Sequence, residues 1–260
     1  MRALMSKLKP LVDMSLEDKL AITKVIIERN LRDYEGHCVV SFSGGKDSQL
    51  VLYIALSIDP TVPVIFNNTG VEYPETVRFI RELSVAWDFT LVETHPSRTF
   101  WDCIQDRGFP KTKNNRSNHK SNICCYHLKE KPNLLAMRSH GWACVFTGVT
   151  APESWQRQML ALTHGTCYTM KNENIHKVHP ILYWMDYEVR GYLLARGVQI
   201  NPLYLHPSGT VDRVGCSTCT AFATWEKQLS AVNPKLYQLV KSRKDALEQK
   251  IALGLNGGII

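Results

Sequence analysis

The hydrophobic pattern of the chain changes repeatedly between helical spacing and short continuous apolar runs, which indicates helices and strands in alternation. Residues 15–33 carry leucine and isoleucine at helical spacing, and Ser15 can cap that helix with Asp18 in its first turn. Residues 37–42 are β-branched in the middle and predict a buried strand. We also expect helices over 48–58, 74–87, 186–196 and 234–252, and strands over 62–66, 90–93, 142–148 and 177–181.

This alternation predicts an α/β fold, with a parallel twisted sheet, helices on both of its faces and a C-terminal helical segment. We expect an N-terminal helical segment over 1–35, a nucleotide-binding α/β domain with the cysteine cluster over 36–225, and a helical tail over 226–260. Ligands of such sheets bind beyond the carboxyl ends of the strands. Polar loops with glycines follow three of the expected strands, so a site is predicted at that edge.

Composition and charge narrow the class of partner. The chain has 260 residues and a net charge of +7, which suits a polyanion or a small phosphorylated ligand, although an ordinary basic surface has the same charge. No apolar run approaches the ~20 residues of a membrane span, and the N-terminal segment lacks a continuous signal-peptide core. We therefore expect a cytoplasmic protein without a membrane partner.

The hexapeptide SGGKDS joins the first expected strand to the next helix. Two glycines let the backbone turn sharply. The amides that follow converge at the N-terminus of the next helix, the positive end, where an anion is favoured. Lys46 adds positive charge, while Asp47 is suited to binding Mg²⁺ or shaping the loop. The alternative interpretation of this hexapeptide is an ordinary strand-to-helix turn with a solvated lysine and no ligand. The expected nucleotide-binding residues here are Ser41, Phe42, Ser43, Gly44, Gly45, Lys46, Asp47 and Ser48, and the last three are the expected catalytic residues.

The SGGKDS loop resembles the pyrophosphate loop of the adenine-nucleotide α-hydrolases, which include ATP pyrophosphatases and sulfonucleotide reductases. That resemblance implies an adenine nucleotide as ligand, with ATP and Mg²⁺ as cofactors in the members that adenylate a substrate and release pyrophosphate. In the reductases the same loop binds a phosphate or a sulfate.

Further segments resemble the phosphoadenosine-phosphosulfate reductase family. Residues 68–76 (NTGVEYPET) resemble its D-T-G-x-x-F-P-E-T segment, and residues 148–157 (GVTAPESWQR) resemble its G-x-R-x-x-E-S-x-x-R loop. Asn68 replaces the usual aspartate and Thr150 a common arginine. With HPI at 179–181 and NPLY at 201–204, the resemblance covers roughly residues 20–222. It implies further nucleotide contacts from Asn68, Thr69, Gly70, Gly148, Glu153 and Arg157.

The cysteines are grouped in a way that favours metal binding. Four thiolates, in an adjacent pair and a later C-x-x-C, suit either tetrahedral zinc or an iron–sulfur cluster. The pattern resembles that of the iron–sulfur branch of the reductases, which implies one [4Fe–4S] cluster, with zinc as the alternative. Lys129 and Lys131 either offset the charge of such a cluster or are plainly solvated. The expected ligands are Cys124, Cys125, Cys216 and Cys219.

The reductase interpretation meets one obstacle in the sequence. Thiol-dependent reductases of this family carry a nucleophilic cysteine in a C-terminal Glu-Cys-Gly-Leu-His segment, and no cysteine follows Cys219 here. Our leading hypothesis is therefore an enzyme that adenylates a substrate with ATP and supports sulfur transfer to nucleic acid, similar to the DNA-phosphorothioation proteins. The alternative is a phosphoadenylyl-sulfate or adenylyl-sulfate reductase with an external thiol, and a third is a non-catalytic nucleotide-binding subunit of a modification complex.

Partners follow from each hypothesis. The sulfur would come from a cysteine desulfurase or the electrons from a thioredoxin-like thiol donor, and a homodimer is among the oligomeric states left open. The basic segment with Lys111, Lys113, Arg116 and Lys120 suits a phosphate backbone or a bisphosphorylated nucleotide. Among the remaining thiols, Cys103, Cys38 and Cys144 are expected in the core. Cys167, expected in a loop, is the best candidate for a sulfur carrier, although an inert thiol is its commoner role.

Overall fold

The computed structural model describes residues 2–111 and 123–253. The expected basic segment lies mostly outside these residues, although Lys111 is described and exposed. Of the helices that are described, none combines the length and the apolar character of a membrane-spanning segment. The helices are α1 (Arg2–Val12), α2 (Leu16–Asp33), α3 (Lys46–Ile58), α4 (Pro74–Ala86), α5 (Phe100–Arg107), α6 (Ile123–Cys125), α7 (Lys131–Ser139), α8 (Trp155–His164), α9 (Asp186–Ala195), α10 (Trp225–Val232) and α11 (Pro234–Ala252).

A six-stranded sheet with helices on both faces forms the centre of the fold, which confirms the expected α/β class. Its strand order is β3-β2-β1-β4-β6-β5. The register pairs Val40 with Val64 and Cys38 with Cys144, both in parallel strands, while β5 is antiparallel to β6. The strands are β1 (Cys38–Ser41), β2 (Val64–Asn67), β3 (Leu91–Thr94), β4 (Cys144–Phe146), β5 (Cys167–Met170) and β6 (Ile175–Val178).

Contacts divide the chain into two compact units, each made of separate segments. The first contains residues 1–66, 79–93 and 134–201, and therefore almost the whole sheet. The second contains residues 67–78, 94–133 and 202–260. The sequence-based division ran in consecutive segments, and it stays a prediction.

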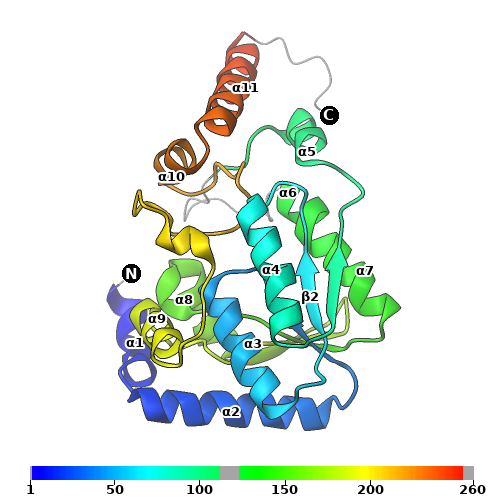
Figure 1. Cartoon of the computed structure of the whole chain (residues 1–260), viewed down its shortest axis with the longest axis vertical. Helices are drawn as coiled ribbons and strands as arrows, with labels where there is room; N and C mark the ends of the chain where they lie inside the picture. Colours follow the sequence, from blue (N-terminus) through cyan, green and yellow to red (C-terminus); the bar gives the residue numbers. More distant parts are fainter. Residues whose placement is uncertain (1, 112–122, 254–260) are drawn as a thin grey trace. The chain divides into compact units, whose positions relative to one another are not determined.

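The first unit positions the SGGKDS loop. β1 is buried, and the chain leaves its carboxyl end through Phe42, whose amide donates to the Ile65 carbonyl at 2.9 Å. The chain then enters α3, which contacts β1, α2 and α9 (Figure 1). Apolar side chains of β1, β2, β4, β6 and α7 form a core on the sheet, with Val39, Ile65, Met137, Val145 and Ile175 among them. Because the sheet and α3 are packed on buried apolar residues, the loop between them starts and ends on rigid elements.

The start of α9 is fixed by a buried ion pair. Lys19 on α2 donates to both carboxylate oxygens of Glu188 at 2.7 Å, and both side chains are nearly inaccessible to solvent. Glu188 also accepts a hydrogen bond from the Met185 amide at 2.7 Å, at the first turn of α9. Breaking a buried pair by removing one partner costs about 3–5 kcal/mol, so this contact holds the N-terminus of α9 in place.

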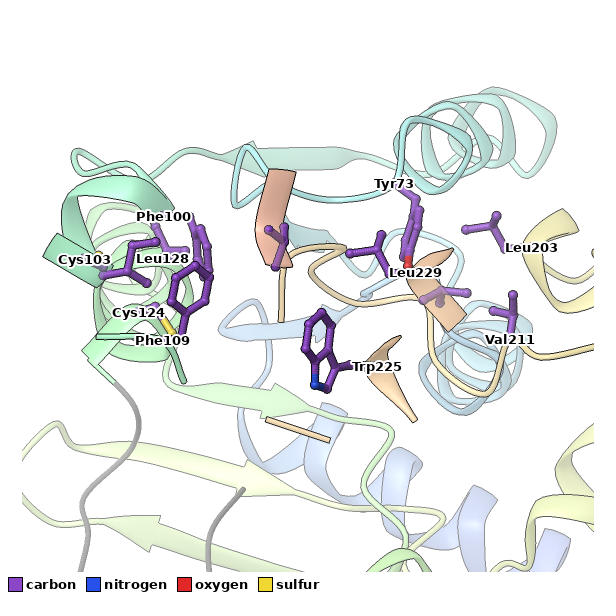
Figure 2. Close-up of a cluster of buried hydrophobic side chains, with 13 residues drawn as sticks. Tyr73, Phe100, Cys103, Phe109, Cys124, Leu128, Leu203, Val211, Trp225 and Leu229 are labelled. Atoms are coloured by element: carbon purple, nitrogen blue, oxygen red, sulfur yellow. The ribbon is translucent and has the colours of Figure 1, made fainter. Parts of the chain in front are cut away.

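A separate hydrophobic cluster forms the core of the second unit. Figure 2 shows Phe100, Phe109 and Leu128 close to Cys124, and Trp225 and Leu229 in the same cluster. Helix α5 begins with a capping box, in which Thr99 and Asp102 satisfy each other's backbone amides. This cluster supports the segments that carry the paired cysteines.

Candidate functional site

The N-terminus of α3 is open to an anion. Gly45 is the N-cap residue, and no side chain among the described residues caps the helix there. Gly44 has a φ of 74°, in the left-handed region that glycine adopts without strain, and this residue makes the sharp turn before the helix. The first amides of a helix have no intrahelical acceptor, so this end offers several donors and a partial positive charge. The local geometry is therefore that of a phosphate or sulfate site.

Two buried contacts hold the loop in this shape. Asn201 is fully buried, and its Nδ2 donates to the Gly44 carbonyl at 3.1 Å. The Ser48 hydroxyl donates to the Gly45 carbonyl at 2.9 Å and lies 3.1 Å from the hydroxyl of Ser43. We predicted Ser48 as a catalytic residue, and its contacts in the loop indicate that it shapes the turn. Asn201 was recognised only as part of a family segment, without a role.

Lys46 is buried and held by two carboxylates. Its Nζ lies 2.8 Å from Asp47 Oδ1 and 2.6 Å from Asp186 Oδ1. Burial by itself lowers the pKa of Lys46, but these two carboxylates outweigh it, and the pKa is raised. The ammonium group is therefore charged at neutral pH. Asp186 was not among the predicted site residues, because it is distant in sequence and lies on a different helix.

The loop after β4 packs directly on the SGGKDS loop. A Cβ atom added to Gly148 would lie 2.4 Å from the Ser48 amide nitrogen and 2.5 Å from the carbonyl carbon of Asp47. Glycine is therefore required here for close approach of two backbones. The structure brings the predicted residues Gly148 and Ser48 together, as the sequence suggested for loops at one sheet edge.

The remaining predicted residues of this loop form a local ion pair. The side chains of Glu153 and Arg157 bond to each other, and the Ser154 hydroxyl caps α8 by accepting from the Arg157 amide at 3.3 Å. Thr150, in the position of a common arginine, is buried. An anion contact from Arg157 stays a prediction.

His179 is a buried group at the end of β6 whose possible role the motif did not disclose. Its Nδ1 lies 2.6 Å from the Thr147 hydroxyl, and its buried Nε2 has no hydrogen-bond partner among the described residues. Burial, together with the positive charges of Lys177 and Arg157, lowers the pKa of His179 to about 4. The ring is therefore neutral in the folded protein at pH 7.

This histidine predicts a pH dependence of stability. The unfolded chain protonates His179 near pH 6.5 but the folded protein only near pH 4, so the unfolded state binds the proton first as the pH falls. We expect the contribution of His179 to the free energy of unfolding to be complete above pH 6.5. This contribution should fall by about 3 kcal/mol as the pH is lowered from 6.5 to 4. Urea unfolding at several pH values, compared with His179→Gln, measures this share, and an equal slope in both proteins would contradict it.

The four predicted metal ligands all line one pocket of the second unit. The pocket has a volume of about 100 Å³ and is also lined by Phe100, Lys129 and Arg213. Cys124 and Cys125 lie on α6, directly before the π-helical segment η1 (Tyr126–Glu130). Short π-helical segments often mark functional sites. The pocket therefore collects thiols from two segments that are far apart in the sequence.

The loop after β2 supports the second thiol pair. Cys216 Sγ lies 3.5 Å from the Thr69 hydroxyl and 3.7 Å from Glu72 Oε1, while the amide of Ser217 donates to the Val71 carbonyl at 2.8 Å. Thr69 was predicted as a nucleotide contact, and here it contacts a cysteine. The side chain of Asn68 accepts a hydrogen bond from the Gly70 amide at 3.1 Å, which shapes the turn.

Four thiols line the pocket, a donor set that suits zinc or an iron–sulfur cluster. Burial raises the pKa of Cys216 to about 11 and also raises the pKa of Cys219. For Cys124, a hydrogen bond with Cys125 and burial raise the pKa. Bound metal ions deprotonate such thiols. Across residues 2–111 and 123–253, no three His, Cys, Asp or Glu side chains are placed to hold a single metal ion. A metal centre in this pocket stays a prediction, which the four thiols in the pocket lining support.

Lys129 is one of two basic residues that line this pocket, with Arg213. Its Nζ is 3.9 Å from Glu72 Oε1, and it lies close to Gly215, next to Cys216. Lys131, in contrast, is exposed. Of the two lysines named from the sequence, Lys129 is thus the one beside the thiols.

The mostly parallel six-stranded sheet and the helices packed on it define an α/β protein. The model of the phosphoadenosine phosphosulfate reductase domain matches residues 37–222, and the chain belongs to this family of enzymes. An adenosine 5′-phosphosulfate reductase of Chelativorans sp. is 26% identical, with 77% of this chain and 74% of that protein covered. An uncharacterized protein of Methanocaldococcus jannaschii is 28% identical over 70% of this chain, but the match spans only 41% of that longer protein.

Solved structures agree with this assignment at the level of the fold. The phosphate complex of the phosphoadenylyl-sulfate reductase from Candida auris has a TM-score of 0.52 and 20% identity, and the alignment covers 76% of this chain and 88% of that one. At this identity the likeness concerns the fold alone. The family resemblance seen in the motifs is therefore confirmed. Similarity to the phosphorothioation proteins stays a prediction.

Proposed function

We propose that the protein is a sulfonucleotide reductase that binds adenylyl sulfate or its 3′-phosphorylated form through the SGGKDS loop. The observation that carries this proposal is the uncapped N-terminus of α3 behind the Gly44 turn, which offers amides to a terminal sulfate or phosphate. The names of the curated relatives, among them the adenosine 5′-phosphosulfate reductase of Chelativorans sp., favour the same substrate class.

The chemistry needs an external thiol. A thiolate of a thioredoxin-like donor attacks the sulfur of the substrate, an S–S bond forms, the S–O bond breaks, and the adenine nucleotide leaves with its phosphate. A second thiol of the donor then attacks the sulfur atom of the first thiol, which forms a disulfide and releases sulfite with the electron pair. The loop amides and Lys46 bind and orient the substrate's anionic end during these steps.

We further propose that Cys124, Cys125, Cys216 and Cys219 hold a [4Fe–4S] cluster, with zinc as the alternative. When bound, such a group would cross-link the two segments of the second unit that carry these thiols. Lys129 lies among these thiols and is suited to balancing the negative charge of a thiolate-bound cluster.

A second candidate function is ATP-dependent adenylation with sulfur transfer to nucleic acid. The observation that favours it is the pair of carboxylates at the loop, Asp47 and Asp186. Carboxylates repel a bare anion but bind Mg²⁺, which accompanies ATP and not a sulfonucleotide. In this case a cysteine desulfurase would supply the sulfur, and pyrophosphate would be released.

One pair of assays separates the two functions. Anaerobically purified protein is given adenylyl sulfate or phosphoadenylyl sulfate with a reduced thioredoxin-like donor, and sulfite is measured. In parallel, pyrophosphate release from ATP and Mg²⁺ is measured with single-stranded and double-stranded DNA present. Sulfite release without ATP turnover supports the reductase, and the reverse supports adenylation.

Lys46→Ala tests in both assays whether the SGGKDS loop binds the substrate. Removing the charged group at the anion site should lower kcat/KM by about 10- to 100-fold, since a lost charged hydrogen bond costs about 1.5–3 kcal/mol. If kcat/KM is unchanged in Lys46→Ala, the SGGKDS loop is not part of the substrate site.

A further inference from the structure

The Lys46 ammonium group is already held by two carboxylates. Nζ lies 2.8 Å and 2.9 Å from the two oxygens of Asp47, and 2.6 Å from Asp186 Oδ1. A lysine ammonium group has three hydrogens and accepts no hydrogen bond. An incoming phosphate or sulfate therefore meets a lysine whose charge two carboxylates already balance, and it competes with them for Lys46.

Asp186 is the carboxylate that is easier to release. Its side chain is 62% exposed, whereas the Asp47 side chain is 23% exposed and belongs to the adjacent residue. The Lys46 side chain is buried, but Asp47 stays beside it when Asp186 leaves, and the released Asp186 is solvated. Exchange of Asp186 for a ligand anion therefore leaves neither charge buried and alone.

Arg190 provides Asp186 with a second cation. Its Nε donates to Asp186 Oδ2 at 2.8 Å, one turn along α9, while Lys46 uses the other oxygen, Oδ1. Hydrogen bonds from Lys46 and Arg190 outweigh burial and lower the pKa of Asp186, so the carboxylate is charged at neutral pH. After Lys46 turns to a ligand, Asp186 still has Arg190 as its partner.

The backbone of α9 does not need to move for this exchange. Glu188, two residues after Asp186, is held by Lys19 and by the Met185 amide in a buried arrangement. The first turn of α9 is therefore fixed, and the exchange involves side chains alone.

We propose that Asp186 is a positioning residue of the anion site, acting through Lys46 as its exchangeable counter-ion. It orders the lysine in the free protein and yields it to the terminal phosphate or sulfate of the nucleotide, while Arg190 retains the carboxylate. This rests on the proposed function only in that the SGGKDS loop binds an anion, and it applies to either candidate nucleotide.

Binding of inorganic pyrophosphate without divalent cations tests the exchange. Isothermal titration in EDTA should show Asp186→Asn binding about two- to fivefold more tightly than the wild type, because one competitor for Lys46 is gone. Arg190→Gln should bind pyrophosphate about threefold more weakly. Of the two cations that hold Asp186, only Lys46 is then left, so Asp186 competes more strongly with the ligand for Lys46. The double variant should bind like Asp186→Asn, since Arg190 acts only through Asp186.

Several outcomes would overturn this proposal. If Asp186 and Arg190 only stabilise the start of α9, both single variants will bind pyrophosphate more weakly than the wild type. If Arg190 acts only through its charge at long range, Arg190→Gln will lower the affinity equally in the wild type and in Asp186→Asn. Glu82→Gln removes an exposed carboxylate on α4 and should change affinity less than twofold. Thermal unfolding of each variant checks folding, and Asp186→Ser serves if the asparagine variant does not fold.

Lys46→Ala separates this proposal from the proposed function. If Lys46→Ala binds pyrophosphate as the wild type does, or neither binds, the anion site itself is wrong. If Lys46→Ala loses affinity but Asp186→Asn gains none, the site stands and the exchange is refuted.

Discussion

Replacing Gly148 with alanine should reduce nucleotide turnover by at least about 100-fold. The added methyl group would lie 2.4 Å from the Ser48 amide and 2.5 Å from the Asp47 carbonyl carbon, so the backbone of the SGGKDS loop must shift. A misplacement of about 1 Å in a binding loop can cost about 100-fold in rate, and overpacking costs about 1–3 kcal/mol of stability. Turnover, pyrophosphate affinity and thermal unfolding measure the three consequences.

Gly191→Ala is the matched control for this substitution. Gly191 lies inside α9, and an added Cβ meets no atom within 4 Å. Alanine there should leave turnover unchanged and stabilise the helix by about 0.5–1 kcal/mol. Wild-type affinity and turnover in Gly148→Ala would contradict the tight packing of the two loops.

Replacing Cys216 with serine should remove the inorganic centre. We expect iron and acid-labile sulfide, or zinc if zinc is the native metal, to fall to background in anaerobically purified protein. A serine hydroxyl is a poor ligand for these metals, and structural sites lose metal when one thiolate is lost. Metal analysis and the visible absorption spectrum of wild type and variant provide the measurement, and equal iron and sulfide in the wild type would exclude zinc.

Cys167→Ser controls for loss of a thiol that does not line the pocket. Cys167 is half-buried on β5, in the first unit. This variant should retain its full metal content, and unchanged activity would also remove Cys167 as a sulfur carrier. Full metal content in Cys216→Ser, in contrast, would show that the pocket does not hold the centre through this thiol.

The sequence predicted the parts of the fold that depend on local signals. Five of the strands and the helices around 15–33, 74–87 and 234–252 are where apolar spacing placed them, within a few residues. The SGGKDS loop was recognisable because two glycines between a buried strand and a helix have few other uses. The proximity of Gly148 followed from parallel topology, since carboxyl ends of parallel strands lie at one edge.

Other features depend on contacts between residues far apart in the sequence. Strand β5 was missed, and its residues, expected in a loop around Cys167, form an antiparallel edge strand in which no residue is fully buried. Helix α8 was also missed, although Ser154 is a local capping signal at its start. The ion pair of Asp186 with Lys46 has no local signature. Thr69 was assigned to the nucleotide by its motif, while its hydroxyl contacts Glu72 and Cys216 in the structure. Tertiary packing decides such cases.

The two thiol pairs of the pocket leave the ribosome at different times, because Cys124-Cys125 precedes Cys216-Ser217-Thr218-Cys219 by a long stretch of chain. A group bound to all four would act as a staple that closes this stretch into a loop. Covalent closure of a loop on the order of 100 residues is worth about 4–5 kcal/mol in the chain-entropy account. The second unit would thus reach its full stability only after translation passes residue 219, and metal scarcity in the cell would lower the yield of native protein.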